Sequence, residues 1–262
     1  MRAILYIGGF FVLVAGLQLW LFSARTDEIF AWTIASQMSA AFIGSFYWAA
    51  AVLALMSARQ ETWSRARLGV PGVLVFVWLT LLATLLHLDL FHLATRQFTA
   101  TGAAWAWLVI YVAEPPLLLL AYVLQLRAAG GNPPRLDPLP RGYRVLLAGT
   151  GAVLLVLGAG LFLVPLDIGA AWPWQLTELT GRAIGAWLVA VAGLLAAMWW
   201  ENDCSRIRLG TYLLVTFPVL AGIAIARYAT ELDWSTFGAP VLLAGLAAVL
   251  AAGLWGWRLS TR

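Results

Sequence analysis

Long apolar stretches constrain the fold of this chain more than any other feature. They recur along the whole sequence, and each is close to the roughly 20 residues that a helix needs to cross a bilayer. We predict eight spans, at 3–22, 36–57, 69–91, 103–127, 144–166, 179–200, 209–228 and 239–258. Inside lipid a single open chain can satisfy its backbone polar groups only within helices. The sequence therefore predicts an all-α integral membrane protein with eight transmembrane helices.

Composition supports this class and excludes several others. The chain is 63% hydrophobic and 11% charged, whereas about 25% of the residues of a soluble domain are charged. All 16 basic residues are arginine, so a Schiff-base cofactor or a P-loop, both of which need lysine, is excluded. The arginines lie in short loops between spans, so we expect no nucleic-acid partner. We also expect no cofactor and no metal site.

Arginine distribution predicts the orientation. If the N-terminus is inside, twelve arginines fall on the inner side and only Arg25, Arg96, Arg182 and Arg227 on the outer side. Positive charge accumulates on the cytoplasmic side of membrane proteins. We therefore expect both termini in the cytoplasm and a location in the cell (inner) membrane of bacterial type.

Tryptophans lie close to the predicted span ends. Indole rings prefer the interface between membrane and water. We predict an outer belt that contains Trp32, Trp105, Trp107, Trp172, Trp174 and Trp234, and an inner belt that contains Trp63, Trp199, Trp200, Trp255 and Trp257. An aromatic cage for a ligand is the alternative interpretation.

A polar hexapeptide occurs twice. "SRARLG" at 64–69 returns as "SRIRLG" at 205–210, an offset of 141, and the same offset gives 10 identities in 34 positions over residues 36–69. We predict a duplicated four-helix unit: a first repeat at 1–127, a cytoplasmic linker at 128–143 and a second repeat at 144–262. Because each unit has an even number of spans, the repeats should be parallel. The layout resembles that of transporters built from parallel repeats, a likeness of fold only.

Small residues at every fourth position indicate close helix packing. Gly181 and Gly185 form one such pair, and Ala244, Ala248 and Ala252 continue the pattern in the last span. Such stripes let helix backbones approach each other. They favour packing inside the bundle, and a homo-oligomer interface is the alternative.

Glu114 is the most unusual residue of the chain. It lies near the middle of the fourth span and is followed by Pro115 and Pro116. A charge at this depth costs about 2.5–3.5 kcal/mol on insertion scales, so the carboxyl group should be protonated or paired. The prolines remove two helical N–H groups, which predicts a kink, or two half-helices that meet at Glu114. We expect a proton or cation site, or alternatively a packing group that stabilises the kink.

Possible partners of Glu114 lie in the same span and at the predicted outer ends of other spans. Tyr111 is one helical turn before Glu114 and is a candidate hydrogen-bond partner. Arg182 can either turn outward to Glu178 or point inward and, with Arg227, line a positively charged outer vestibule that faces Glu114.

A polar cluster is expected at the outer end of the third span. If the helix continues, Asp89, His92 and Arg96 share one stripe, whereas His87 lies elsewhere around the helix, which makes a two-histidine metal or haem site from this helix unfavourable. The cluster is either an interfacial cap or a group that handles protons.

These features favour a membrane protein that binds or translocates a small or amphiphilic solute, or a proton, at a site between the repeats near Glu114. An accessory subunit of a membrane complex is the second interpretation. A membrane enzyme that acts on lipid is the third, and the absence of a recognisable catalytic set makes us lean against it.

Overall fold

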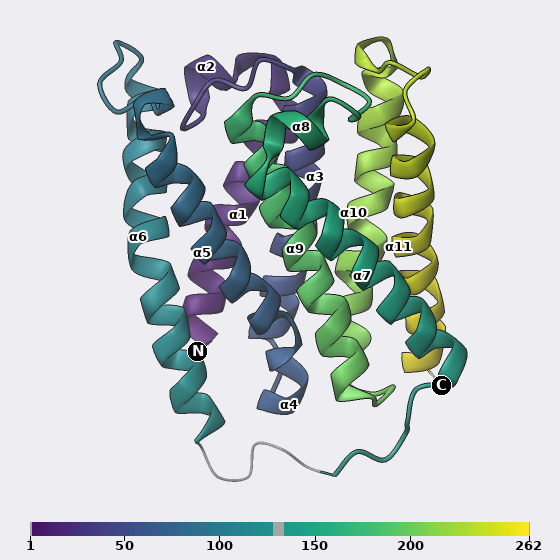
Figure 1. Cartoon of the computed structure of the whole chain (residues 1–262). Coiled ribbons are helices and arrows are strands. Elements are labelled where there is room, and N and C mark those ends of the chain that lie inside the picture. The colour runs from purple at the N-terminus through teal and green to yellow at the C-terminus, as the bar shows by residue number, and fades with distance from the viewer. Residues whose placement is uncertain (1, 128–133, 262) are drawn as a thin grey trace.

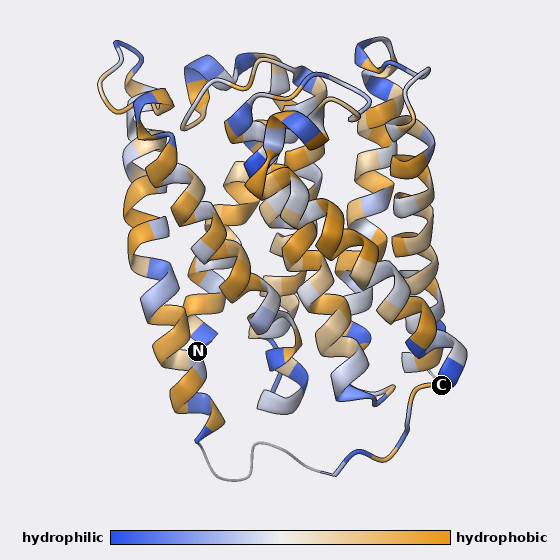
Figure 2. Ribbon diagram, viewed as in Figure 1, coloured by the Kyte–Doolittle hydropathy of each residue, from blue (hydrophilic) through white to orange (hydrophobic). Residues whose placement is uncertain are grey.

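The computed structural model describes residues 2–127 and 134–261, and in these ranges the fold is helical. Eight helical segments are long and apolar enough to cross a membrane: α1 (Arg2–Leu21), α3 (Gln37–Ala58), the run α4–η2–α5 (Trp63–Leu86), α6 (Phe98–Leu126), α7 (Arg141–Leu163), α9 (Glu178–Glu201), α10 (Arg208–Arg227) and α11 (Gly238–Ser260). They form one bundle with hydrophilic residues concentrated at its two ends (Figures 1 and 2). The predicted class, an all-α polytopic membrane protein, is confirmed.

Short helices complete the architecture. The third span consists of α4 (Trp63–Ala66), η2 (Arg67–Gly69) and α5 (Val70–Leu86). The connections carry η1 (Ser23–Arg25), α2 (Thr26–Ile29), η3 (Leu88–Leu90), α8 (Pro165–Gly169) and η4 (Ala229–Glu231). The two chain ends lie at the same end of the bundle (Figure 1), which we call the terminal face.

Local sequence explains where several helices end. α7 stops at Leu163 because Pro165 disfavours helical backbone at Val164, and Pro165 then opens α8. α9 ends at Glu201, and the following residue, Asn202, has a φ of 44°, the left-handed conformation that terminates helices.

The third span ends earlier than predicted. α5 stops at Leu86 rather than at residue 91, and Phe91 is extended and pairs with Trp32 in an antiparallel bridge. The backbone N–H of His92 also donates to the carbonyl of Ala31, at 2.9 Å. These contacts tie together two connections at the end of the bundle opposite the chain termini, so the helical stripe predicted for Asp89, His92 and Arg96 does not form.

Four helices make the centre of the bundle, and four lie outside them. α3, α5, α9 and α10 are the more buried spans, whereas α1, α6, α7 and α11 are largely exposed to the surroundings. In the centre, Phe46 stacks on Phe217 and Phe76 stacks on Trp187, each with ring centroids 3.8 Å apart. One aromatic core therefore joins segments from both ends of the chain.

The peripheral helices are arranged unevenly. α1 packs along α3 and α7 packs along α9, while α3 contacts α10 and α5 contacts α9. α11 also packs on α7, but α6 packs on α5 and α2 rather than on α1. The space between α1 and α6 is therefore less closed than the space between α7 and α11.

Glycines let two of these helix pairs come close together. A Cβ atom on Gly185 of α9 would lie 2.6 Å from the carbonyl oxygen of Gly158 in α7, and one on Gly44 of α3 would lie 2.7 Å from the backbone nitrogen of Trp20 in α1. Only a residue without a side chain permits such contact. Gly185 therefore serves packing within the bundle.

The outer tryptophan belt is wrong for three of its members. Trp32, Trp107 and Trp174 are buried, with 3%, 8% and 4% of their surface exposed. Trp107 donates to Thr84 Oγ1 at 3.0 Å and Trp174 to Ser39 Oγ at 2.8 Å. These hydroxyl groups satisfy the indole N–H inside the protein, so these two rings need no interfacial water.

The described part of the linker is attached to the second half of the chain. Asp203 accepts from the backbone N–H of Leu136 at 2.9 Å, and the backbone N–H of Cys204 donates to Asp137 O at 2.8 Å. Asn202 Oδ1 accepts from the N–H of Leu139. Residues 128–133 of the predicted linker lie outside the described residues.

Candidate functional site

Glu114 lies on the side of α6 that faces α1. Its side chain is half-buried, and a Cβ atom added to Gly8 of α1 would lie 3.4 Å from Glu114 Oε1. Within the described residues, no hydrogen bond or ion pair reaches the Glu114 carboxylate. The carboxyl group therefore stands in the gap between two peripheral helices without a polar partner.

A cavity of about 480 Å³, which we call the outer cavity, approaches Glu114 from the ends of α1 and α6 that lie opposite the terminal face. Its lining includes Gln18 of α1, Phe30 beside α2 and Gly102 of α6, and it continues to Gly8 and Glu114. The amide of Gln18 donates to the carbonyl of Ile29 at 2.8 Å, so this polar group already has one partner. The volume lies within the range of small-molecule pockets.

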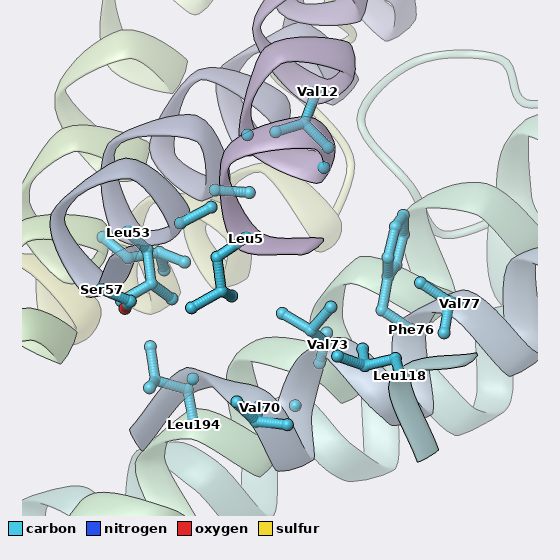
Figure 3. A pocket seen from close by; sticks show the side chains of 18 of the residues that line it. Leu5, Val12, Leu53, Ser57, Val70, Val73, Phe76, Val77, Leu118 and Leu194 are labelled. Carbon is cyan, nitrogen blue, oxygen red and sulfur yellow. The ribbon is translucent and has the colours of Figure 1, made fainter. Parts of the chain in front are cut away.

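A second, narrower cavity of about 80 Å³ reaches Glu114 from the terminal half of the bundle. Its lining is mostly apolar: Leu5 and Val12 of α1 face Val73 and Phe76 of α5, and Leu118 of α6 closes one side (Figure 3). Leu194 of α9 contributes a further wall. The second half of the chain thus takes part in a site that belongs mainly to the first half.

The two cavities share the same four residues, Gly8, Val12, Tyr111 and Glu114. The carboxyl group consequently lies in the wall of both hollows.

Tyr111 lines both cavities, but its hydroxyl is bonded elsewhere. The hydroxyl groups of Tyr111 and Tyr47 lie 3.0 Å apart, and both side chains are buried. Trp107 packs on the Tyr111 ring with centroids 4.4 Å apart. The structure thus brings Tyr111 to the site of Glu114, while its hydrogen bond goes to α3.

The proline pair does not divide the helix. α6 runs from Phe98 to Leu126 with Pro115 and Pro116 inside it, so the expectation of two half-helices is wrong. Neighbouring turns keep enough hydrogen bonds for the helix to continue through the prolines. The carbonyls of Tyr111 and Val112 nevertheless lack the N–H donors that residues 115 and 116 would otherwise supply.

Arg182 does not approach Glu114. Its NH1 atom lies 2.9 Å from Glu178 Oε2 and 2.6 Å from His87 Nε2, so the side chain takes the outward course that was one of the two alternatives. Burial, followed by the charge of Arg182, lowers the pKa of His87 below its usual range. A neutral imidazole can accept a hydrogen bond from the guanidinium group.

The other outer residues also lie apart from the cavities. His92 binds the carbonyl of Phe30 through Nδ1 and Thr33 Oγ1 through Nε2, both at 3.0 Å. Asp89 is exposed on η3, and its charge acts on His87. The alternative of a positively charged vestibule lined by Arg182 and Arg227 is not supported, because both side chains are bonded elsewhere.

Arg227 is bound to the first span rather than to a cavity. Its NH1 atom donates to the carbonyl of Trp20 at 3.1 Å, and its guanidinium lies 4.9 Å from the ring centre of Tyr228. It therefore links the C-terminal end of α10 to the C-terminal end of α1.

Three residues of the site escaped the sequence prediction: Gly8, Gln18 and Tyr47. Two features of the sequence could have indicated these residues: polar side chains at positions 18 and 47 inside apolar spans, and the glycine pair at positions 8 and 9. Their meaning depends on which helices are neighbours, which hydropathy does not reveal.

In the described part of the chain, the fold is that of an integral membrane protein with eight helices long and apolar enough to span a membrane, and one carboxyl group lines two cavities. Comparison with models of protein families, with curated proteins and with solved structures finds no match for this chain. Within residues 2–127 and 134–261, no group of three His, Cys, Asp or Glu side chains is placed to hold a metal ion.

Proposed function

We propose that this protein binds a small or amphiphilic solute, or a proton, at Glu114 and moves it across the membrane. The observation that carries the proposal is that Glu114 lines two cavities, one toward each end of the bundle. Burying a carboxyl group without a partner costs free energy, which a bound proton or cation would reduce. Intramembrane ionisable groups that face a cavity commonly have such roles.

The chemistry of the lining narrows the solute class. The outer cavity has aromatic and aliphatic walls, and its polar groups inside the bundle are Gln18, Glu114 and the hydroxyl groups of Tyr47 and Tyr111, which are bonded to each other. A ligand with an apolar body and one hydrogen-bonding or cationic end would match these walls. The opening between α1 and α6 also gives an amphiphile a lateral route from the lipid.

We also infer that the scaffold consists of two parallel four-helix repeats, 1–127 and 144–262. The helix contacts support this, because α1 on α3 corresponds to α7 on α9, and α3 on α10 corresponds to α9 on α5. The side chains of Ser36 and Thr177, related by the same offset of 141, cap α3 and α9 in the same way. The arginine distribution supports cytoplasmic termini and a cell-membrane location.

The substitution Glu114→Gln tests the proposed function. In liposomes that contain a pH-sensitive dye, we expect the variant to lose proton uptake driven by a membrane potential. N-phenyl-1-naphthylamine, an uncharged amphiphile, serves as the probe for the outer cavity, and we expect the variant to bind it more weakly. The melting temperature should change by less than about 3 °C, the effect of roughly 1 kcal/mol in a chain of this size.

A steric variant tests the same site without removing the acid. Gly8→Leu would fill the space beside Glu114, whereas Gly149→Ala, at a position with open space around it, is the matched control. We expect Gly8→Leu to reduce both uptake and probe binding. A loss of stability in Glu114→Gln with uptake and probe binding intact would instead favour the accessory-subunit interpretation, in which Glu114 is a packing group.

A further inference from the structure

A buried ion cluster on the terminal face joins the two halves of the chain. Glu201, the last residue of α9, accepts from Arg67 Nε at 2.7 Å and from Arg206 NH1 at 2.9 Å. Arg135 lies further away, with its NH2 atom 3.8 Å from Glu201 Oε2. Only 6% of the surface of Glu201 is exposed, so two arginines from different halves enclose one carboxylate.

The repeated hexapeptide identifies a counterpart of this cluster. The offset of 141 relates Arg206 to Arg65, Arg208 to Arg67 and Glu201 to Gln60. The counterpart therefore has two arginines, again one from each half, and a neutral amide, whereas the Glu201 cluster has two arginines and a carboxylate.

The counterpart residues do lie together. Gln60, Arg65, Arg208, Ser205 and Tyr212 line one cavity of about 240 Å³, which has no acidic residue in its described lining. Both arginine side chains are exposed, and neither guanidinium forms a hydrogen bond or ion pair with the described residues. A third arginine, Arg206, also lines the cavity and is paired with Glu201, so Arg65 and Arg208 are the two cations of the lining that lack an anionic partner in the described residues.

The N-terminus of α10 adds to the positive character of this cavity, which we call the Gln60 cavity. α10 begins at Arg208 without a side-chain cap, so its first N–H groups and the positive end of its dipole lie at this cavity. The side chain of Gln60 donates to the carbonyl of Met56 at 3.2 Å, and the backbone carbonyl of Gln60 accepts from Arg2 at 2.9 Å. Gln60 is thus held in place at the rim of the membrane span.

We propose that the Gln60 cavity binds a phosphate group, which Arg65 and Arg208 hold as Arg67 and Arg206 hold Glu201. The planar guanidinium group matches phosphate oxygens with two parallel hydrogen bonds. Basic pockets between helix ends at the membrane surface suit anionic lipid headgroups, and a free phosphate would present the same oxygens. This site is separate from Glu114 and does not depend on the function proposed there.

The test compares three additives on the purified full-length protein in a mild uncharged detergent. Phosphatidylglycerol supplies the phosphate on a lipid, inorganic phosphate supplies it free, and phosphatidylcholine is the zwitterionic control. We expect a concentration-dependent rise in melting temperature with the phosphate source that the site recognises. The double substitution Arg65→Gln with Arg208→Gln should weaken the apparent affinity by about tenfold or more, the effect of losing charged hydrogen bonds.

Two further variants make the test specific. Arg59→Gln with Arg258→Gln removes two exposed arginines that are not part of the cavity lining, and it should leave the response unchanged. Gln60→Glu supplies the missing carboxylate, so it should raise the melting temperature without additive and remove the response.

The outcomes distinguish a lipid headgroup from free phosphate, and some of them would overturn the proposal. A response to phosphatidylglycerol alone identifies a lipid headgroup, and a response to inorganic phosphate identifies a free ligand. The proposal is overturned if neither source produces a response. It is also overturned if the response survives both the double substitution and Gln60→Glu.

Discussion

Glu114 and Glu201 show how differently one chain treats two acids in its helices. Glu201 is surrounded by arginines, with Arg67 and Arg206 in direct contact. Glu114 faces a glycine and two cavities and has no bonded partner in the described residues. A fully paired buried acid is part of the structure, whereas an unpaired one beside a cavity is available for chemistry.

His87 makes stability depend on pH. Burial and Arg182 lower its pKa in the folded protein, while Glu178 and Asp89 act in the opposite direction with smaller effect. As pH falls below about 6.5, the unfolded chain takes up the proton before the folded chain does. The stability present at higher pH is therefore lost progressively as pH falls toward the folded-state pKa.

We expect the melting temperature of the wild-type protein in detergent to fall between pH 7.5 and pH 5, and His87→Gln to fall less over the same range. Differential scanning fluorimetry measures both. His92→Gln is the matched control, since His92 is bonded to neutral oxygens. If the melting temperatures of the wild-type protein and His87→Gln depend equally on pH, His87 is not the cause of the pH-dependent stability.

Helix pairs explain why the two cavities that share Glu114 lie beside α1 and α6. α11 packs on α7, but α6 leans on α5 and α2 and leaves α1 apart. The glycines at the α7–α9 contact bring those two backbones together. The tight pairs hold the scaffold, and the loose pair leaves room for a ligand.

Gly185→Ala should destabilise the protein by about 1–3 kcal/mol, the usual cost of adding a group to a packed core. The new methyl group would lie 2.6 Å from the carbonyl oxygen of Gly158, and a backbone atom cannot move aside as a flexible side chain can. Gly222→Ala in α10 is the control, because nothing lies within 4 Å of its added Cβ atom. Because alanine has a higher helix propensity than glycine, this control substitution should leave the stability unchanged or raise it slightly. Thermal unfolding of both variants in one detergent provides the measurement, and equal melting temperatures would contradict the packing argument.

The bundle as a unit depends on interleaving of the two halves of the chain. α3 packs on α10, α5 packs on α9, and the central aromatic rings come from all four helices. The Glu201 cluster adds a polar junction on the terminal face. These contacts do not require a continuous chain between the halves.

A protease site inserted between residues 128 and 133 should therefore yield two fragments that remain together after cleavage. We expect them to co-elute in size-exclusion chromatography in mild detergent, with a melting temperature close to that of the uncut protein. A matched insertion without the cleavage sequence controls for the insertion itself. Separation of the fragments would mean that the interface between the halves is weaker than its packing indicates.

The sequence alone was enough for the membrane class and the number of spans. A bilayer requires long apolar helices, so their signal is carried by consecutive residues and needs no knowledge of neighbours. Boundaries were less accurate where connections interact with each other, as at Phe91 and Trp32. Burial of Trp107 and Trp174 was also missed, because their partners Thr84 and Ser39 lie in other segments.

Glu114 was identifiable because a carboxyl group followed by two prolines is exceptional inside a span. Its surroundings were not identifiable, and the expected partner Arg182 is instead bonded to Glu178 and His87. Which residues face a carboxyl group depends on the rotation and spacing of helices that are far apart in sequence. Local hydropathy therefore determined what crosses the membrane, and only tertiary packing decided that α1 and α6 stand apart with Glu114 between them.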